Sequence, residues 1–285
     1  MGSETMRTAL GGKENARERG VTRRRGAFVL ACVVTCLVPT ASANDLCGAT
    51  IVDDLKLDHD LTCPGDGLIV GANAIKIDLN AHTITGSGSG IGVLTSGRSG
   101  VVITGGTIRN FTIGVQLVAS TGVVVKEIRV IGNRDGIFLI GSSGNIIKEN
   151  TASQNSRVGV MLRPGAIRNS TQNLVKENTL SDNTNGVILV ETPSGNVFKE
   201  NIISGSSNAG IALNGGVSGN AIKENALGGN ATGILFNLGA TGLLPTSNAL
   251  VENSITMSTC GVKGPAGDNT FKENLFEGNI ADTCP

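Results

Sequence analysis

The sequence predicts an all-β fold, a single parallel β-helix of about nine coils, and two repeated features predict it. The first is a six-residue motif that begins and ends with asparagine. Five of its six copies contain Lys-Glu. Its closing asparagines are 28, 23, 24, 28 and 21 residues apart, and the copies occupy residues 145–150, 173–178, 196–201, 220–225, 248–253 and 269–274. The second feature is a glycine followed by apolar residues, in phase with the first, at Gly67, Gly92, Gly114, Gly136, Gly159, Gly186, Gly210, Gly233 and Gly261. A period of this length is typical of stacked repeats, none of which can bury its apolar residues alone.

Short strands rather than helices fill each repeat. Each has two or three alternating apolar stretches separated by Gly, Asn, Ser and Asp, with no helical run of ten residues. One turn of strands per repeat is a parallel β-helix. Two inward columns are expected, namely Ile147, Val175, Phe198, Ile222, Leu250 and Phe271, and five residues later Ala152, Leu180, Ile203, Leu227, Ile255 and Phe276. A further column is expected to adopt left-handed bends and to hydrogen-bond from coil to coil, at Asn133, Asn155, Asn183, Asn230 and Asn279.

The N-terminal segment predicts export. Residues 1–43 contain the triplet Arg23–Arg25, an apolar run over residues 26–38 and a small-x-small site at residues 41–43, as in a secretory signal peptide. Residues 44–285 are then the β-helix domain, with no transmembrane segment, and the location is secreted or periplasmic. Without residues 1–43 the chain has 16 basic and 20 acidic residues, so no basic surface for a nucleic acid is expected.

Four cysteines follow the predicted signal peptide. At about 4.8 Å per coil, Cys47 and Cys63 lie roughly 40 Å from Cys260 and Cys284, far beyond the reach of a disulfide. We therefore predict Cys47–Cys63 and Cys260–Cys284 bonds, each tying one end of the stack, in the oxidising compartment that export supplies. The same distance excludes a single metal site built from all four thiolates.

The opening coils and the repeats resemble a known family. The stretch from Cys47-Gly48-Ala49-Thr50-Ile51 to Leu61-Thr62-Cys63-Pro64-Gly65, and Ile77 to Gly86 after it, are similar to the start of secreted bacterial right-handed parallel β-helix repeat proteins. The asparagine-rich repeats extend the resemblance to about residue 280, although Ala81 stands where the family usually has glycine. The resemblance implies a right-handed helix. The family includes polysaccharide lyases, polygalacturonate hydrolases, mannuronan epimerases and non-catalytic accessory proteins, so it leaves the function open.

The catalytic motifs of these relatives are incomplete here. Arg163-Pro164 and Arg168 form Arg-Pro-x-x-x-Arg instead of the lyase pattern Arg-x-Pro-x-x-Arg. The Gly-His-Gly and Arg-Ile-Lys motifs of the hydrolases are absent. Asp58-His59-Asp60 only loosely resembles the epimerase pattern Asp-Pro-His-Asp, and both His59 and His82 are expected to be structural.

The repeats also resemble the periplasmic accessory protein that matures the copper sites of nitrous oxide reductase. Copper requires soft or imidazole ligands. The coils offer only Met161 and Met257 as soft ligands, far apart in the stack, so we predict no metal site and no cofactor. Calcium is expected only if the chain is a lyase.

Arginine is concentrated in one part of the chain. Every arginine after residue 43 lies between Arg98 and Arg168, and the planar guanidinium suits carboxylates. The leading prediction is therefore a non-catalytic rigid surface that has a structural role or binds an anionic polysaccharide, with candidate binding residues Arg109, Arg129, Arg134, Arg157, Arg163 and Arg168. The absence of Trp and Tyr disfavours a neutral glycan.

The alternative is a lyase or epimerase of a uronate polysaccharide, with weak catalytic candidates Asp135, Arg157, Arg163 and Arg168. The column alignment places Asp135 one coil from Arg157. This arrangement predicts either a surface salt bridge, which we favour, or an acid or base of altered pKa.

Two further surface features are predicted. The repeat lengthens at the same corner at residues 163–171 and 237–245, three coils apart. The interpretation that we favour is that corners merely tolerate insertions, and the alternative is that the two loops rim a shallow groove. The recurring Lys-Glu pair predicts a stripe of alternating charge that is a solvated face.

Overall fold

A computed structural model describes residues 46–240 and 242–285. The predicted signal peptide lies outside these residues, so its boundary with the domain stays a prediction. The described part contains 29 strands and no helix, which confirms the all-β prediction. Accordingly, none of the described residues forms a helix with the length and apolarity needed to cross a membrane.

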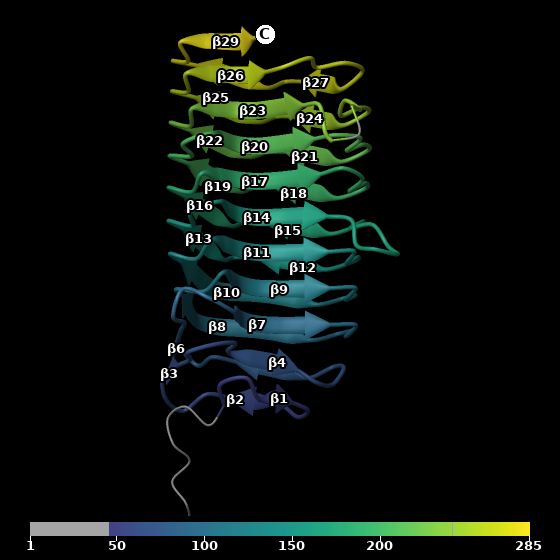
Figure 1. Cartoon of the computed structure of the whole chain (residues 1–285). Helices are drawn as coiled ribbons and strands as arrows, with labels where there is room; N and C mark the ends of the chain where they lie inside the picture. The colour runs from purple at the N-terminus through teal and green to yellow at the C-terminus, as the bar shows by residue number, and fades with distance from the viewer. Residues whose placement is uncertain (1–45, 241) are drawn as a thin grey trace, which may run out of the picture. The chain divides into compact units, whose positions relative to one another are not determined.

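One face of the stack is an eleven-stranded parallel sheet, called sheet A here. Its first and last strands are ten turns apart, one more than expected. In Figure 1 these strands run to the right in front, and the chain returns behind them while it rises, which is a right-handed path. The strands are β1 (Thr50–Ile51), β4 (Leu68–Val70), β7 (Ile91–Ser96), β9 (Ile113–Val118), β11 (Asp135–Ile140), β14 (Val158–Arg163), β17 (Asn185–Val190), β20 (Ala209–Asn214), β23 (Thr232–Asn237), β26 (Cys260–Lys263) and β29 (Ala281–Cys284).

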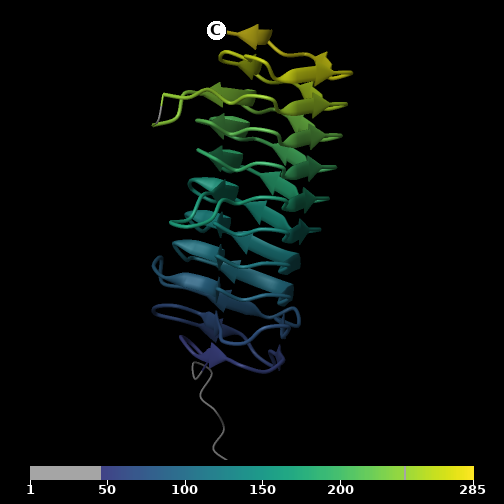
Figure 2. The same cartoon turned by 90° about the vertical axis from the view of Figure 1, so that its right-hand side faces the viewer.

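The remaining strands build two further parallel faces, which Figure 2 shows from the side. The second face consists of β2 (Leu55–Lys56), β5 (Lys76–Asp78), β12 (Ile146–Lys148), β15 (Leu174–Lys176), β18 (Val197–Lys199), β21 (Ala221–Lys223), β24 (Ala249–Val251) and β27 (Thr270–Lys272). The third face consists of β3 (Leu61–Thr62), β6 (Thr83–Thr85), β13 (Thr151–Ser153), β16 (Thr179–Ser181), β19 (Ile202–Ser204), β22 (Ala226–Gly228), β25 (Ser254–Thr256) and β28 (Leu275–Glu277). The longer strands β8 (Val102–Arg109) and β10 (Val124–Ile131) contribute to both.

The core runs along the inside of the three faces. Both predicted inward columns are fully buried from the coil of β12 to the coil of β24. The prediction fails in the last coil, where Phe271 is 39% exposed and Phe276 is only partly buried. No described coil covers these two side chains from above, so their outer edges meet solvent.

Three ladders of buried asparagines line the corners of the stack. In each ladder the Oδ1 of one asparagine accepts the backbone N–H of its counterpart one coil earlier, and its Nδ2 donates to a backbone carbonyl of that earlier coil. Asn178, for example, accepts from Asn150 at 3.0 Å and donates to the carbonyl of Ile147 at 2.9 Å. Two ladders are continuous, namely Asn145, Asn173, Asn196, Asn220, Asn248 and Asn269, and Asn150, Asn178, Asn201, Asn225, Asn253 and the partly buried Asn274. The third ladder runs from Asn133 through Asn155 to Asn183 and is then interrupted by serines, so that it continues only as the pairs Ser206–Asn230 and Ser258–Asn279.

The prediction that Asn133, Asn155, Asn183, Asn230 and Asn279 adopt the left-handed backbone is wrong. The residue before each of these five does so instead, namely Gly132 with φ 65°, Gln154 with φ 55°, Asp182 with φ 55°, Gly229 with φ 64° and Gly278 with φ 64°. The reason is geometric: the asparagine side chain must turn inward to reach the next coil, so the reversal of the backbone falls one residue earlier.

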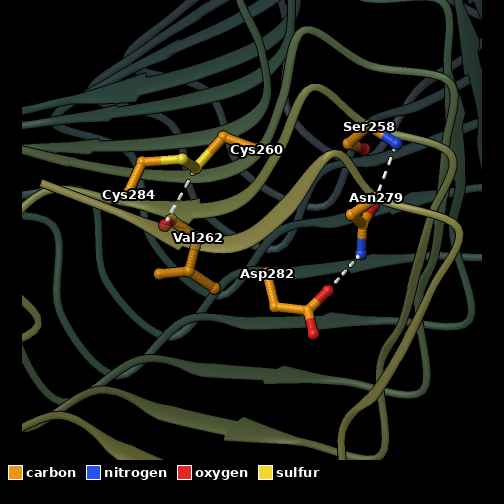
Figure 3. The surroundings of a disulfide bond; sticks show 6 residues. All are labelled: Ser258, Cys260, Val262, Asn279, Asp282 and Cys284. Carbon is orange, nitrogen blue, oxygen red and sulfur yellow. Dashed lines mark hydrogen bonds between the residues drawn. A yellow bond between two sulfur atoms is a disulfide. The ribbon is translucent and has the colours of Figure 1, made fainter.

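Both predicted disulfides are present. Cys47 pairs with Cys63, with 5.3 Å between their Cα atoms, and Cys260 pairs with Cys284, with 6.2 Å between theirs. Figure 3 shows the second bond joining β26 to the final strand β29, near the side chains of Asn279 and Asp282. The bond therefore fastens the last coil to the coil beneath it.

Removing this second bond is expected to loosen only the end of the stack. Because a solenoid repeat contacts only its neighbours, Cys260→Ser with Cys284→Ser lowers the free energy of opening the last coil by about 2 kcal/mol. Hydrogen exchange would report faster exchange in β27–β29 and unchanged protection in β12–β16. Unchanged protection of β27–β29 would contradict the expectation.

Candidate functional site

The outer surface of sheet A carries a second apolar cluster. Along β11, Ile137 and Leu139 join the interior core, whereas the alternate residues Phe138 and Ile140 belong to a separate cluster. Alternate residues of a strand point to opposite sides, so this cluster lies outside. Its buried members are Phe138, Val158, Met161, Ile188, Ala209, Ala212 and Leu235. The cluster forms a closely packed apolar platform on a surface that is usually polar.

Two hollows flank the part of sheet A formed by β7, β9, β11 and β14, called the four-strand surface here. The entry hollow, of about 530 Å³, precedes these strands and is lined by polar groups such as Asn110, Arg134 and Gln154. The exit hollow, of about 470 Å³, follows the same strands and is lined in part by Val118, Ile140, Ile167 and Arg168. A six-residue strand spans about 20 Å, so the hollows lie at opposite edges of one surface.

Asp135 and Arg157 form a closed ion pair at the entry edge. Asp135 begins β11 and is 1% exposed, and Nε and Nη2 of Arg157 each donate to one of its oxygens at 2.5 Å. The guanidinium carbon also lies 5.8 Å from the centre of the Phe138 ring. Both carboxylate oxygens are thus occupied, and the predicted salt bridge is present, although its carboxylate is buried and not at the surface as expected.

A one-residue insertion makes this pair possible. A single residue, Arg134, separates Asn133 from β11, whereas two residues separate Asn155 from β14. The extra residue is Arg157, which reaches back one coil to Asp135. Asn208 is the matching extra residue before β20, and its Nδ2 donates to Oδ1 of Asn185 one coil earlier at 2.8 Å. The spacing between the asparagine column and the strand carries this signal, which the sequence prediction missed.

The structure brings four of the six candidate arginines to the four-strand surface. Arg134 lines the entry hollow beside the Asp135–Arg157 pair. Arg163 ends β14 and is exposed, in register with the outward Ile140, and Arg168 lines the exit hollow. Arg109 and Arg129 lie on the third face, where Arg109 donates to Oγ1 of Thr85 at 3.1 Å. These two cannot share a ligand with the other four on the front of sheet A.

The exit hollow does not lie between the two corner loops, where the sequence suggested a groove. The first loop folds back onto the preceding coil, because a Cβ at Gly141 would lie 3.1 Å from the Cα of Gly165 and 2.8 Å from the carbonyl oxygen of Arg168. The exit hollow is therefore on the N-terminal side of this loop, and none of the described residues of the second loop lines it. Each loop covers its own preceding coil rather than facing the other.

The opening coils hold both histidines of the described residues. Nδ1 of His59 lies 2.5 Å from Asp58, and Nδ1 of His82 lies 3.1 Å from Asp60. The pKa of Asp60 is lowered, chiefly by the backbone N–H of Thr83 and then by the hydrogen bond with His82. Within the described ranges, no three residues among His, Cys, Asp and Glu are grouped so as to hold a metal ion.

The Lys-Glu stripe pairs most of its own charges. Five left-handed glutamates have their carboxylates beside the preceding lysine, with Nζ–Oε1 distances of 3.0 Å for Lys148–Glu149 and 2.9 Å for Lys199–Glu200, whereas Glu252 follows Val251. Hydrogen bonds from these lysines lower the pKa of Glu149 and of Glu200. The stripe is the solvated face that the sequence predicted, and it offers no unpaired row of one charge.

A family model described as periplasmic copper-binding protein (NosD) matches residues 65–166 and 114–283. No curated protein matches the sequence. Among solved structures, the chain is similar to the A-module of the Azotobacter vinelandii mannuronan C-5 epimerase AlgE6, with 19% identity, 80% of this chain and 69% of that chain covered, and a TM-score of 0.67. It is also similar to the alginate lyase of Paenibacillus sp. str. FPU-7, with 15% identity, coverage of 85% and 97%, and a TM-score of 0.67.

A third similar structure is a mutant tailspike protein of E. coli bacteriophage HK620 in complex with a pentasaccharide. It has 13% identity, with 83% of this chain and 52% of that chain covered, and a TM-score of 0.60. At these identities the three likenesses show the parallel β-helix fold alone.

Proposed function

The chain belongs to the family of periplasmic copper-binding proteins described as NosD, and from this premise we propose that it is a non-catalytic, secreted or periplasmic β-helix that binds an anionic polysaccharide across the four-strand surface. One observation carries the proposal. Arg134 and Arg157 lie at one edge of an apolar surface, and Arg163 and Arg168 lie at the other. Guanidinium groups at both edges suit a chain of carboxylates laid across the strands.

Copper, the metal of the family name, does not fit the described residues. Copper sites use thiolate, thioether or imidazole ligands. All four cysteines in the described part are in disulfides, and neither of its histidines belongs to a group of three His, Cys, Asp or Glu residues that could hold a metal ion. Met161 is packed into the platform with 6% exposed, whereas Met257 is 73% exposed on a corner far along the stack. The proposal therefore includes no metal and no cofactor.

Binding is favoured over a lyase or epimerase reaction by the state of Asp135. Proton abstraction from a uronate needs a base that can reach the substrate. Asp135 is the buried carboxylate of the four-strand surface, and Arg157 occupies both of its oxygens. Three of the similar structures are named for mannuronan, alginate or a bound pentasaccharide, which supports a carbohydrate as the ligand.

Calorimetric titration with a panel of polyuronate oligosaccharides tests the proposal. Arg163→Ala with Arg168→Ala is expected to weaken binding at least about tenfold, since two charge-assisted contacts are lost. Arg129→Ala is the matched control, because it removes an exposed arginine of the same coils from the third face. Added salt should weaken binding further.

The same samples separate binding from catalysis. No absorbance from unsaturated sugar ends is expected on incubation with the oligosaccharides, with or without calcium. A rise that Arg163→Ala abolishes would replace the proposal by the lyase alternative. Equal losses of affinity for the Arg129 variant and the double variant would show that sheet A is not the binding face.

A further inference from the structure

The exit hollow is a preformed apolar recess rather than a gap beneath a loose loop. The first loop has a defined shape, because the N–H of Gly165 donates to the carbonyl of Arg168 within it at 2.7 Å, and the loop is tied to the following coil through Asn169 Oδ1, which accepts from the hydroxyl of Thr192 at 2.8 Å. Gly165 packs so closely on Gly141 that a Cβ at Gly165 would lie 3.2 Å from the Cα of Gly141. The recess therefore exists before any ligand arrives.

Apolar side chains dominate the lining of the recess, and the largest of the exposed ones lies on the first loop. Val118, Ala119 and Ile140 form its floor, and Ile167 on the loop is 94% exposed. Ile140 also packs against the platform of sheet A. The recess is thus continuous with the four-strand surface, and a group that entered it would cover the exposed face of Ile167.

The charge at this corner is positive. The residues that follow the four strands, 96–101, 118–123, 140–146 and 163–173, include Arg98, Arg163 and Arg168 and no carboxylate. Glu191 is the nearest acidic residue at the same corner, one coil later in the chain. No described carboxylate forms an ion pair with Arg163 or Arg168. The two guanidinium groups beside the recess are available to an anion.

We infer that the exit hollow binds a carboxylate that carries a short apolar group, with the apolar group against Ile140 and Ile167 and the carboxylate beside Arg168. Such a ligand is either an O-acylated uronate residue of a polysaccharide or a free short-chain carboxylate. The first source rests on the proposed function, in which the polymer already crosses the four-strand surface. The hollow then selects acylated over unsubstituted polymer.

Three probes distinguish the sources: a polyuronate oligosaccharide, the same oligosaccharide after chemical O-acetylation, and free hexanoate. The acetylated oligosaccharide is expected to bind about tenfold more tightly than the unsubstituted one, as partial burial of one isoleucine implies. Ile167→Ser should remove this difference and leave the affinity for the unsubstituted oligosaccharide unchanged. Ile202→Ser is the matched control, because Ile202 is an isoleucine that is 55% exposed on the third face.

The outcomes separate this inference from the proposed function. If both oligosaccharides bind equally and Ile167→Ser changes neither affinity, the inference is overturned while polysaccharide binding stands. If neither oligosaccharide binds but hexanoate does, and Ile167→Ser abolishes that binding, the ligand class is upheld with the free acid as its source and the proposed function fails. Binding of none of the three probes overturns both.

Discussion

Replacing Asn178 by alanine is expected to lower the free energy of unfolding by about 4 kcal/mol, because buried hydrogen-bonding groups then lose their partners. Asn178 is 1% exposed and accepts the backbone N–H and the side-chain Nδ2 of Asn150, both at 3.0 Å. Its own Nδ2 donates to the carbonyls of Ile147 and Lys176, each at 2.9 Å, and to Oδ1 of Asn201 at 3.0 Å. Alanine retains none of these side-chain contacts, and water does not reach the corner to replace them.

Guanidinium chloride unfolding followed by circular dichroism measures this effect. Asn169→Ala is the control, because Asn169 is exposed and its Oδ1 accepts a single hydrogen bond, from Thr192. The control should change stability by less than about 0.5 kcal/mol. Similar losses for the two variants would mean that the ladder contributes no more than an ordinary surface hydrogen bond.

A methyl group added at Gly159 is the second large perturbation, with an expected loss of about 3 kcal/mol from overpacking. A Cβ there would lie 2.8 Å from the carbonyl oxygen of Gly186 in the next coil and 3.2 Å from Nδ2 of Asn183. Neither neighbouring atom can move easily, because the first belongs to the backbone and the second to an asparagine side chain that is hydrogen-bonded in a ladder. The contact can be relieved only by moving two coils apart, which breaks the hydrogen bonds between them.

Gly65→Ala tests whether the clash is responsible, since Gly65 has no heavy atom within 4 Å of an added Cβ and no left-handed backbone. This variant should unfold at nearly the wild-type denaturant concentration. A loss at Gly65 as large as at Gly159 would show that the contact with the next coil is not the cause, since Gly→Ala without a clash is expected to stabilise slightly by reducing the entropy of the unfolded chain. The same close approach recurs at Gly114 and Gly210, each 2.8 Å from the next glycine carbonyl, and it explains why the glycine marker repeats.

The sequence predicted those parts of the structure that depend on periodicity. Residues at equal phase stack in one column, so the inward columns were predictable, and the length of the stack made the disulfide pairs predictable. The contact between Asp135 and Arg157 was also predicted, although the residue in register with Asp135 is Val158. The left-handed position was predicted one residue too late, because propensity favours asparagine at such a position while the ladder requires its side chain elsewhere. The hydrogen-bond demand of the buried amide outweighs its local preference.

The candidate site was predictable only in part, because residues that are close in the sequence can lie on different faces of the β-helix. Arg129 lies between the columns of Asn150 and Asn155, and this phase assigns it to the third face despite its nearness to Arg134. Arg157 reaches Asp135 because one extra residue precedes β14. An insertion of one residue is too small to be recognised in a repeat whose length already varies from coil to coil. The exit hollow depends on the direction in which the first loop folds, and Gly141 and Gly165 set that direction through a contact that no repeat pattern encodes.

The ladders also have a consequence for how such a gene can change. Every coil presents the same donors to the coil above and the same acceptors to the coil below, although the ladder partners are 21 to 28 residues apart in the chain. Duplication or deletion of one whole repeat therefore leaves each remaining asparagine with a partner of the same kind. Mutation can lengthen or shorten the protein in steps of one coil, and it can enlarge a corner loop without disturbing its neighbours. The number of coils and the lengths of the corner loops can thus change during evolution while the fold stays the same.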